Sequence, residues 1–255
     1  MEYFIKVGTK EMTLYNPRIY YQILSKYLDR LYRDQAPYSK AFKFIDDLRA
    51  KEELPKRIAD VACGTGLFLE SFKKVGYDII GSDLSKDMLD QAVIRLPGEL
   101  LIQASYHEVT FPNLVPLIVS FFNSFAYCQD LQTLSKVLVH LKSQLLPGGL
   151  IIFDLAVTDA PEEFFTVKSF TFDDGTQLSR TFLGYPEGRT FHSHFVFVVF
   201  ENHKLQIHAA ESTRGIFSEQ DVLQAIDTAG LKLYPVDSGY SDLSNTATFV
   251  AQRSR

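Results

Sequence analysis

The sequence predicts an α/β fold: a doubly wound, mostly parallel sheet of seven strands, interrupted by an antiparallel β insert. Apolar runs alternate with amphipathic segments over residues 51–160 and 218–255, as in a βα repeat. Residues 161–217 instead alternate apolar and polar side chains with a period of two, which is typical of antiparallel strands. The string Ile-Ala-Asp-Val-Ala-Cys-Gly-Thr-Gly at 58–66 indicates an apolar strand that ends at a tight glycine turn before a helix.

The large sheet can be assigned element by element. Strands are expected at 57–62, 77–82, 100–104, 116–122, 150–154, 231–236 and 246–252. Helices are expected between them, at 67–75, 85–96, 130–146 and 218–230. Ser85, Asp130 and Ser218 stand where a side chain can cap the first turn of a helix. These assignments leave no internal repeat and no low-complexity linker.

The insert and the N-terminal segment lie outside this repeat. Two stretches of the insert, 190–200 and 204–211, alternate most regularly and predict a long hairpin. A sheet so rich in Phe and Val must bury one face, either over a ligand pocket or against a second subunit. The second alternative predicts a homodimer, and the sequence favours neither. Residues 1–50 are helical in character and rich in tyrosine.

Composition excludes several classes of function. The 255 residues are 46% hydrophobic and 22% charged, which suits one domain with an insert. A formal net charge of −5 argues against nucleic-acid binding, because affinity for phosphates depends on clustered Lys and Arg. Cys63 and Cys128 have no spacing typical of a metal site or a disulfide, which favours a reducing compartment. Without a long apolar run or a signal-like start, we expect a cytoplasmic protein that does not enter a membrane.

The glycine turn, with Asp83 seventeen residues after Gly66, predicts a nucleoside-cofactor site. A dinucleotide fold needs a third glycine for close packing of helix on strand, and Leu69 stands there instead. The string Asp-Val-Ala-Cys-Gly-Thr-Gly at 60–66 resembles the first motif of the class I S-adenosylmethionine-dependent methyltransferases. Gly-Ser-Asp-Leu-Ser-Lys-Asp-Met-Leu at 81–89 resembles their second motif.

This resemblance implies a Rossmann-like methyltransferase fold with an antiparallel final pair of strands. It also implies S-adenosylmethionine as the cofactor and S-adenosylhomocysteine as its product. The cofactor-binding positions expected on this basis are Asp60, Ala62, Gly64, Thr65, Gly66, Asp83, Leu84, Met88, Ser105, Tyr106, Phe122 and Asn123. Ser105 stands where the family usually has an acid that accepts from the adenine amino group, and a hydroxyl accepts more weakly.

Two further strings resemble a small-molecule subgroup that includes amino-sugar N,N-dimethyltransferases. Phe-Phe-Asn-Ser-Phe-Ala-Tyr at 121–127 resembles the segment of that subgroup whose last position faces the substrate. Tyr-Leu-Asp-Arg-Leu-Tyr at 27–32 resembles, with one residue inserted, the subgroup's Y-D-x-x-Y element over the cofactor, so residues 1–50 are expected to cover the substrate. The resemblance implies substrate contacts for Tyr27, Tyr38, Tyr127 and Arg214.

The chemistry implied by the resemblance asks little of the protein. Because the sulfonium of the cofactor activates its own methyl group, the protein must mainly hold the acceptor in line and exclude water. An amine acceptor needs only weak base assistance. The catalytic candidates are Tyr127, His107 and Tyr32, with the insert's His192 and His194 as further options. This histidine pair lacks an Asp, Glu or Cys cluster at ligand spacing, so no metal site is expected.

We therefore expect a methyltransferase that acts on a small-molecule acceptor, an amine rather than a hydroxyl. The first alternative is a nicotinamide-dependent oxidoreductase, which Leu69 disfavours. The second alternative is a non-catalytic module that binds S-adenosylmethionine and never generates S-adenosylhomocysteine. Equilibrium binding separates the first alternative from the expected function, and product formation separates the second.

Overall fold

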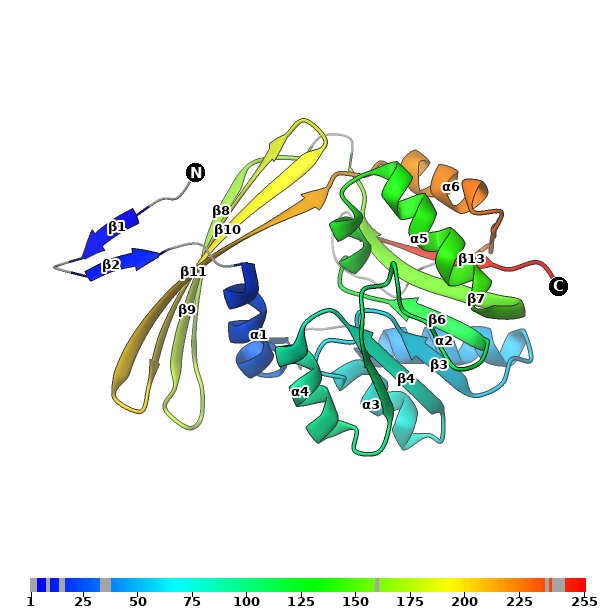
Figure 1. Ribbon diagram of the computed structural model, residues 1–255, viewed down its shortest axis with the longest axis horizontal. Coiled ribbons are helices and arrows are strands. Elements are labelled where there is room, and N and C mark those ends of the chain that lie inside the picture. Colours follow the sequence, from blue (N-terminus) through cyan, green and yellow to red (C-terminus); the bar gives the residue numbers. More distant parts are fainter. Residues whose placement is uncertain are drawn as a thin grey trace.

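The described part of the protein contains two large sheets with a helix between them, and a short two-stranded sheet near its start. The computed structural model describes residues 4–7, 10–13, 17–32, 38–158, 161–236, 239 and 246–255. Figure 1 shows the larger sheet, covered by helices, and the smaller antiparallel sheet, with α1 (Pro17–Tyr32) between them. No helix in these ranges is long and apolar enough to span a membrane.

The larger sheet has seven strands and confirms the predicted fold class. Its order across the sheet is β12 (Lys232–Leu233), β13 (Thr246–Gln252), β7 (Leu145–Ala156), β6 (Val115–Ser120), β3 (Arg57–Asp60), β4 (Asp78–Asp83) and β5 (Leu100–Gln103). The strands from β7 to β5 in this order run parallel to one another, whereas β13 runs antiparallel to both of its neighbours, β7 and β12. The carboxyl ends of the parallel strands therefore meet at one edge, where ligands bind in sheets of this kind.

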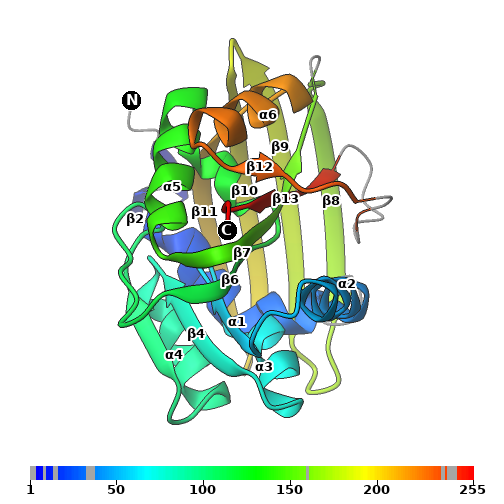
Figure 2. The ribbon, with the colours of Figure 1, turned by 90° about the vertical axis from the view of Figure 1, so that its right-hand side faces the viewer.

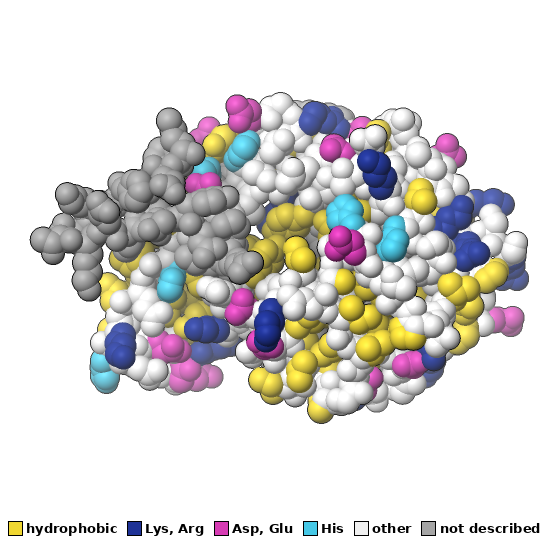
Figure 3. All heavy atoms as spheres, viewed as in Figure 1, with side chains coloured by type: hydrophobic (Ala, Val, Ile, Leu, Met, Phe, Trp, Pro, Cys, Tyr) yellow, Lys and Arg dark blue, Asp and Glu magenta, His cyan; other side chains and the backbone are white. Residues whose placement is uncertain are grey.

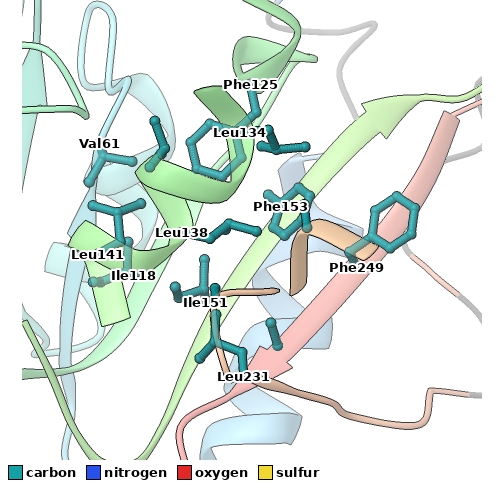
Figure 4. Packing of buried hydrophobic residues seen from close by; sticks show 14 of the residues in the cluster. Val61, Ile118, Phe125, Leu134, Leu138, Leu141, Ile151, Phe153, Leu231 and Phe249 are labelled. Carbon is teal, nitrogen blue, oxygen red and sulfur yellow. The ribbon is translucent and has the colours of Figure 1, made fainter. Parts of the chain in front are cut away.

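Helices cover both faces of this sheet because its strands are apolar on both sides. α2 (Tyr38–Lys51), α3 (Leu67–Lys74) and α4 (Lys86–Arg95) share one face, and α5 (Leu131–Ser143) and α6 (Glu219–Thr228) share the other. Successive strand residues alternate between the two cores, so that Leu117 faces α2 and α3 while Ile118 faces α5. Figure 4 shows the core between the sheet and α5 and α6, where Phe153 and Phe249 from neighbouring strands pack beside Leu138 of α5.

The predicted helix caps are present. The Ser85 hydroxyl accepts from the Met88 N–H, Asp130 accepts from a backbone N–H at the start of α5, and Ser218 forms a capping box with Asp221. Several boundaries were predicted wrongly: β7 covers Leu145–Ala156 rather than 150–154, and β12 covers only Lys232–Leu233 rather than 231–236. α5 ends at Ser143 rather than near 146, because Leu145 already pairs with β6 as the first residue of β7.

The insert forms a separate four-stranded antiparallel sheet. Its strands are β8 (Phe164–Thr171), β9 (Gln177–Glu187), β10 (Thr190–Glu201) and β11 (Lys204–Gly215), in the order β11-β10-β9-β8. Phe195, Phe197 and Val199 point inward and pack against α1, as their period of two predicts. The space-filling view shows hydrophobic side chains at the junction of the two sheets, with acidic and basic groups interspersed elsewhere on that face (Figure 3).

The outer face of this sheet carries apolar side chains that face solvent. The most exposed are Phe165, Val167, Val196, Phe200, Leu205 and Ile207. The sheet therefore buries one face over the remainder of the chain and presents the other. The homodimer expected through the insert stays a prediction, as do the domain boundaries drawn from the sequence.

The expectation of a helical N-terminal segment is wrong for its first residues. β1 (Phe4–Val7) and β2 (Lys10–Thr13) pair as an antiparallel hairpin, and helix begins only at Pro17. The strings Phe-Ile-Lys-Val and Lys-Glu-Met-Thr are short and contain β-branched residues, which favour strands. The remaining described part of the segment is helical, as predicted, in α1 and α2.

Candidate functional site

The turn after β3 and the acid at the end of β4 are joined directly. Gly64 has φ +54° and donates its N–H to Asp83 Oδ2 at 2.8 Å. Asp83 Oδ1 accepts from the Ser85 N–H, also at 2.8 Å. Burial raises the pKa of Asp83, while these backbone hydrogen bonds oppose the shift. The two motifs, seventeen residues apart in the sequence, thus form one polar site at the edge of the sheet.

Two glycines permit the close packing that this site requires. A Cβ added to Gly66, which has φ +74°, would lie 2.7 Å from Leu96 Cδ1 at the end of α4. A Cβ on Gly81 of β4 would lie 2.9 Å from the Cys63 Sγ. Cys63 is buried, and burial raises the pKa of its thiol, so its role is to fill the space under the turn.

A second carboxylate lies behind the turn at the end of β3. Asp60 is only 3% exposed, and its Oδ1 accepts from the Ala62 N–H at 3.1 Å. Burial raises the pKa of Asp60 to about 7, and the charges of Asp83 and Asp154 add to the shift. Three carboxylates from neighbouring strand ends therefore make this edge of the sheet acidic, which suits a cationic ligand.

The segment after β6 forms the next wall. Phe122 and Asn123 both have φ +59°, in the left-handed region, and the chain then enters the 3₁₀ helix η1 (Ser124–Cys128). Asn123 is fixed from both sides: its N–H donates to Asp154 Oδ1 at 2.7 Å, and its Oδ1 accepts from the Ala156 N–H at 2.8 Å. This double anchor to β7 presents the start of η1 at the edge of the sheet.

Tyr127 of η1 meets Arg214 of β11. Arg214 Nη2 donates to the Tyr127 hydroxyl at 3.3 Å, and the guanidinium carbon lies 5.1 Å from the centre of the tyrosine ring. Tyr21 of α1 also donates a hydrogen bond to the Tyr127 oxygen. A sheet, a helix and a loop that are far apart in the sequence thus converge on one phenol.

The charges of this cluster are unusual. Arg214 makes no ion pair with a carboxylate anywhere in the described ranges, and its Nε is shielded from solvent without a hydrogen bond. Burial opposes ionisation of Tyr127, but the Arg214 charge and the hydrogen bonds outweigh it, so that the pKa of Tyr127 lies below its usual range. Burial and the neighbouring Tyr127 raise the pKa of Tyr21. Asp83 also contributes to that rise, which places the cluster within electrostatic reach of the glycine turn.

The backbone of β11 is held close to η1. A Cβ on Gly215 would lie 2.6 Å from the Gln129 carbonyl oxygen, so only glycine allows this approach. Gln129 Nε2 donates to Thr213 Oγ1 at 3.1 Å on the other side of Arg214. These contacts, at the residues before and after Arg214 in β11, fix the position from which its side chain reaches Tyr127.

Other predicted positions take structural places near the site. Met88 is 3% exposed and packs with α1 and the insert, while Leu84 is 70% exposed. Tyr106 packs its ring on Phe125 at 5.4 Å, and burial raises its pKa. The Ser105 hydroxyl donates to Glu108 at 3.5 Å in an exposed turn.

The structure brings some predicted substrate and catalytic residues away from Tyr127. His107 is exposed and its ring is tilted against that of Tyr106, with the ring centres 4.8 Å apart, and no contact in the described ranges links it to Tyr127. Tyr27 donates to Glu201 at 3.4 Å and packs in the core between α1 and the insert. Tyr38 instead reaches the wall after β6, with its ring 5.3 Å from Phe122. The side chain of Tyr32 lies outside the described residues.

The insert's histidines lie on the outer face of the smaller sheet. His192 lies 3.3 Å from Glu187, and His194 lies 3.1 Å from Glu211, with Tyr185 stacked on both rings. Neither belongs to a cluster of three possible metal ligands, and the described part of the chain contains no such cluster.

Sequence reasoning missed two members of the site, Tyr21 and Asp29. Tyr21 was one of many tyrosines in a helical stretch, and nothing local distinguished it from its neighbours. Asp29 of α1 accepts from the Thr65 hydroxyl at 2.6 Å and forms an ion pair with Arg95. Asp29 lies within the string 27–32 that was read for its tyrosines, so that string held the signal.

Comparison with known proteins settles the family. Residues 32–233 match the family described as "Methyltransferase domain". The chain belongs to this family. A dTDP-3-amino-3,4,6-trideoxy-alpha-D-glucopyranose N,N-dimethyltransferase of Streptomyces venezuelae is 32% identical to this methyltransferase over 116 residues, 46% of the chain. The match spans about half of that relative's length, 49%.

Two further matches extend over most of the chain. The putative methyltransferase YqeM of Bacillus subtilis (strain 168) is 26% identical over 251 residues, which cover 92% of this chain and 98% of that protein. The crystal structure of Streptomyces venezuelae DesVI superposes with a TM-score of 0.80 at 24% identity, over 90% of this chain and 97% of that one. The likeness to DesVI shows the fold.

These findings confirm the expected family, fold class, enzyme class and cofactor: the chain is an S-adenosylmethionine-dependent methyltransferase with a Rossmann-like fold. Membership of the family also removes the nicotinamide-dependent oxidoreductase from the alternatives. The roles of individual site residues stay predictions.

Proposed function

We propose that this methyltransferase transfers methyl groups from S-adenosylmethionine to an amine of a small, polar, sugar-like acceptor. The observation that carries the proposal is the convergence of Tyr127, Arg214 and Tyr21 beside the glycine turn. The Streptomyces venezuelae relative, which is named an amino-sugar N,N-dimethyltransferase, supports an amine as the acceptor. The absence of clustered basic residues in the sequence fits a small molecule better than a nucleic acid.

The residues at the glycine turn fit the cofactor. The nearest atoms to the position that a Gly64 Cβ would take are the ends of two flexible side chains, Leu28 Cδ2 and Met88 Sδ, both at 4.0 Å, so no backbone crowds the turn on that side. Each Asp83 oxygen accepts one backbone N–H, which leaves lone pairs for two ribose hydroxyls. Asp60 would favour the positive charge of the methionine portion through its buried carboxylate.

Tyr127 would assist the acceptor. When bound, S-adenosylmethionine supplies a methyl group on a sulfonium, which a free amine attacks in line. An ammonium must first lose its proton, and a tyrosine oxygen with a lowered pKa is suited to receive it. Only the phenolate form of Tyr127 can take up this proton, and Arg214 and the Tyr21 hydroxyl would stabilise that form through the hydrogen bonds already present; Tyr127 is a neutral phenol once it has received the proton.

α1 and the smaller sheet would exclude water from this reaction. The inner face of the sheet packs on α1 through Phe195 and Phe197, and α1 reaches the glycine turn through Asp29. Arg214 and Tyr127 lie half-buried between these elements, where their electrostatic interaction is stronger than in water. The smaller sheet would thus serve as a lid over the acceptor.

The test is a comparison of acceptors at constant cofactor concentration. Purified protein is incubated with S-adenosylmethionine and nucleotide-linked or free amino sugars, and with the matching sugars in which a hydroxyl replaces the amine. The proposal predicts S-adenosylhomocysteine formation and a mass increase of one or two methyl groups only with the amines. Turnover of hydroxyl sugars alone would contradict it. Binding of cofactor without product in either series would favour the non-catalytic module.

A further inference from the structure

α1 contacts both the glycine turn and the smaller sheet through two consecutive side chains. Asp29 points to the glycine turn, where it accepts from Thr65. Arg30 points to the smaller sheet, where it donates to Asp174 at 2.8 Å and lies 3.8 Å from the centre of the Phe172 ring. Figure 1 shows the helix in this position between the two sheets. The helix is therefore the physical connection between cofactor turn and insert.

The contact at Asp29 uses both carboxylate oxygens. Oδ1 accepts from the Thr65 hydroxyl at 2.6 Å, and Oδ2 pairs with Arg95 of α4. Arg95 Nε in turn donates to the Thr65 carbonyl at 3.0 Å, and its Nη1 lies 3.6 Å from Glu70. The side chain and the backbone carbonyl of Thr65 are thus both hydrogen-bonded to the Asp29–Arg95 ion pair.

This ion pair differs from the surface pairs of the protein by its burial. The side chains of Asp29 and Arg95 are 18% and 16% exposed, and Thr65 is 2% exposed. Lys43 and Asp47 on α2 are 76% and 65% exposed by comparison. Because exposed pairs contribute little and shielded charge-assisted hydrogen bonds contribute more, Asp29 has a real effect on where α1 lies.

The position of α1 decides two features of the site. Leu28 Cδ2 lies 4.0 Å from the position of a Gly64 Cβ, so this part of the helix covers the turn. Tyr21, two turns earlier on the same helix, reaches Tyr127. Since a helix is rigid over two turns, the contact at Asp29 and the contact at Tyr21 change together.

We propose that Asp29 is a positioning residue, which ties α1 to the glycine turn so that an occupied cofactor site holds Tyr21 at Tyr127. The proposal rests on the proposed function, that is, on the cofactor site and on the cluster of Tyr127, Arg214 and Tyr21, here called the acceptor cluster. Asp29 touches neither reacting atom. It acts through Thr65 on the cofactor side and through the helix on the acceptor side.

The experiment compares Asp29→Asn with Asp47→Asn, which removes a helical carboxylate from an exposed pair. S-adenosylhomocysteine is the ligand, measured by titration calorimetry and by hydrogen exchange of the full chain. Wild-type α1 should gain protection when the ligand binds. In Asp29→Asn the dissociation constant should rise about tenfold, the size expected from a lost charge-assisted hydrogen bond. The ligand should then protect the glycine turn but no longer α1, and Asp47→Asn should match the wild type.

Thr65 supplies a second pair of variants in case Asp29→Asn folds poorly. Thr65→Val removes the hydroxyl and keeps the shape, whereas Thr65→Ser keeps the hydroxyl. The valine variant should lose the ligand-dependent protection of α1, and the serine variant should retain it. A dissociation constant within twofold of wild type, with α1 still protected in Asp29→Asn and Thr65→Val, overturns the proposal. A wild type that does not bind S-adenosylhomocysteine would refute the cofactor site itself, so the two failures differ.

Discussion

Removal of one oxygen from the acceptor cluster is the sharpest test of its chemistry. Tyr127→Phe keeps the ring and its volume but takes away the hydroxyl that accepts from Arg214 and Tyr21. The Arg214 Nη2 group then loses this partner in a half-buried site. Such a loss costs about 1–2 kcal/mol, less than the 3–5 kcal/mol of a fully buried pair. For a chain of this size the melting temperature should fall by about 2–8 °C.

A double-mutant cycle tests whether the cost of Tyr127→Phe comes from leaving the Arg214 charge without its partner. Arg214→Met removes the charge and replaces it by an apolar side chain, so it should cost less stability than Tyr127→Phe does. The variant with both changes should then resemble Arg214→Met, because no unpartnered charge is left. Tyr185→Phe on the outer face is the matched control and should leave stability and activity unchanged. Additive effects of the two changes would show that Tyr127 and Arg214 do not interact.

The catalytic part of the prediction depends on pH. If Tyr127 receives the proton of the ammonium, Tyr127→Phe should slow S-adenosylhomocysteine formation by about 10²-fold at neutral pH. The deficit should shrink as the pH rises through the pKa of the acceptor amine, because the free base no longer needs assistance. Rates are measured with saturating cofactor and one amine acceptor between pH 6.5 and 9.5. A deficit that is constant over this range, or below twofold at neutral pH, refutes proton transfer to Tyr127.

Two further predictions concern the cofactor turn. Asp60 has its pKa raised in the folded protein to about 7, so ionising it costs stability between roughly pH 4 and pH 7, where the unfolded chain has already released this proton. Asp60→Asn should therefore flatten the decline of stability over that window and stabilise the cofactor-free protein at pH 8 by about 1–3 kcal/mol. The affinity of the same variant for S-adenosylmethionine should fall. Equal urea midpoints of the wild type at pH 5 and pH 8 would contradict this prediction. Gly66→Ala should cost about 1–3 kcal/mol of stability and raise the KM for the cofactor, because it adds a clash with Leu96 to the cost of a positive φ. The control is Gly76→Ala, at φ +82° with no neighbour within 4 Å, which should cost about 1 kcal/mol and leave KM unchanged. Equal losses of stability of the two variants in chemical denaturation would refute the packing argument.

The sheet and the cofactor turn could be predicted because their signals are local. Gly64 and Gly66 must adopt positive φ, and the run at 58–61 must be buried, so both leave a mark in the sequence. The same holds for the period of two in β10, which predicted the insert and the face that it buries. Asp83 was predictable for a different reason, since strand order brings the end of β4 beside the turn after β3.

The acceptor side could be predicted only in part because it depends on tertiary packing. Tyr127 and Arg214 were named separately, but only the fold brings them together across 87 positions. Tyr21 resembles several other tyrosines of the N-terminal segment, and its role appears only when α1 lies between two sheets. Asp29 likewise reads as a solvent-exposed helical acid until Thr65 and Arg95 are seen around it.

The central claim is that the glycine turn and Asp83 together bind the adenosyl cofactor. Titration calorimetry of the purified protein with S-adenosylmethionine and with S-adenosylhomocysteine tests it most directly, with Asp83→Asn as the paired variant. The account predicts one site per chain with a dissociation constant of about 1–100 μM for the wild type and a loss of at least about tenfold in Asp83→Asn. A wild type that binds neither compound, or a variant that binds both as tightly as the wild type does, would contradict it.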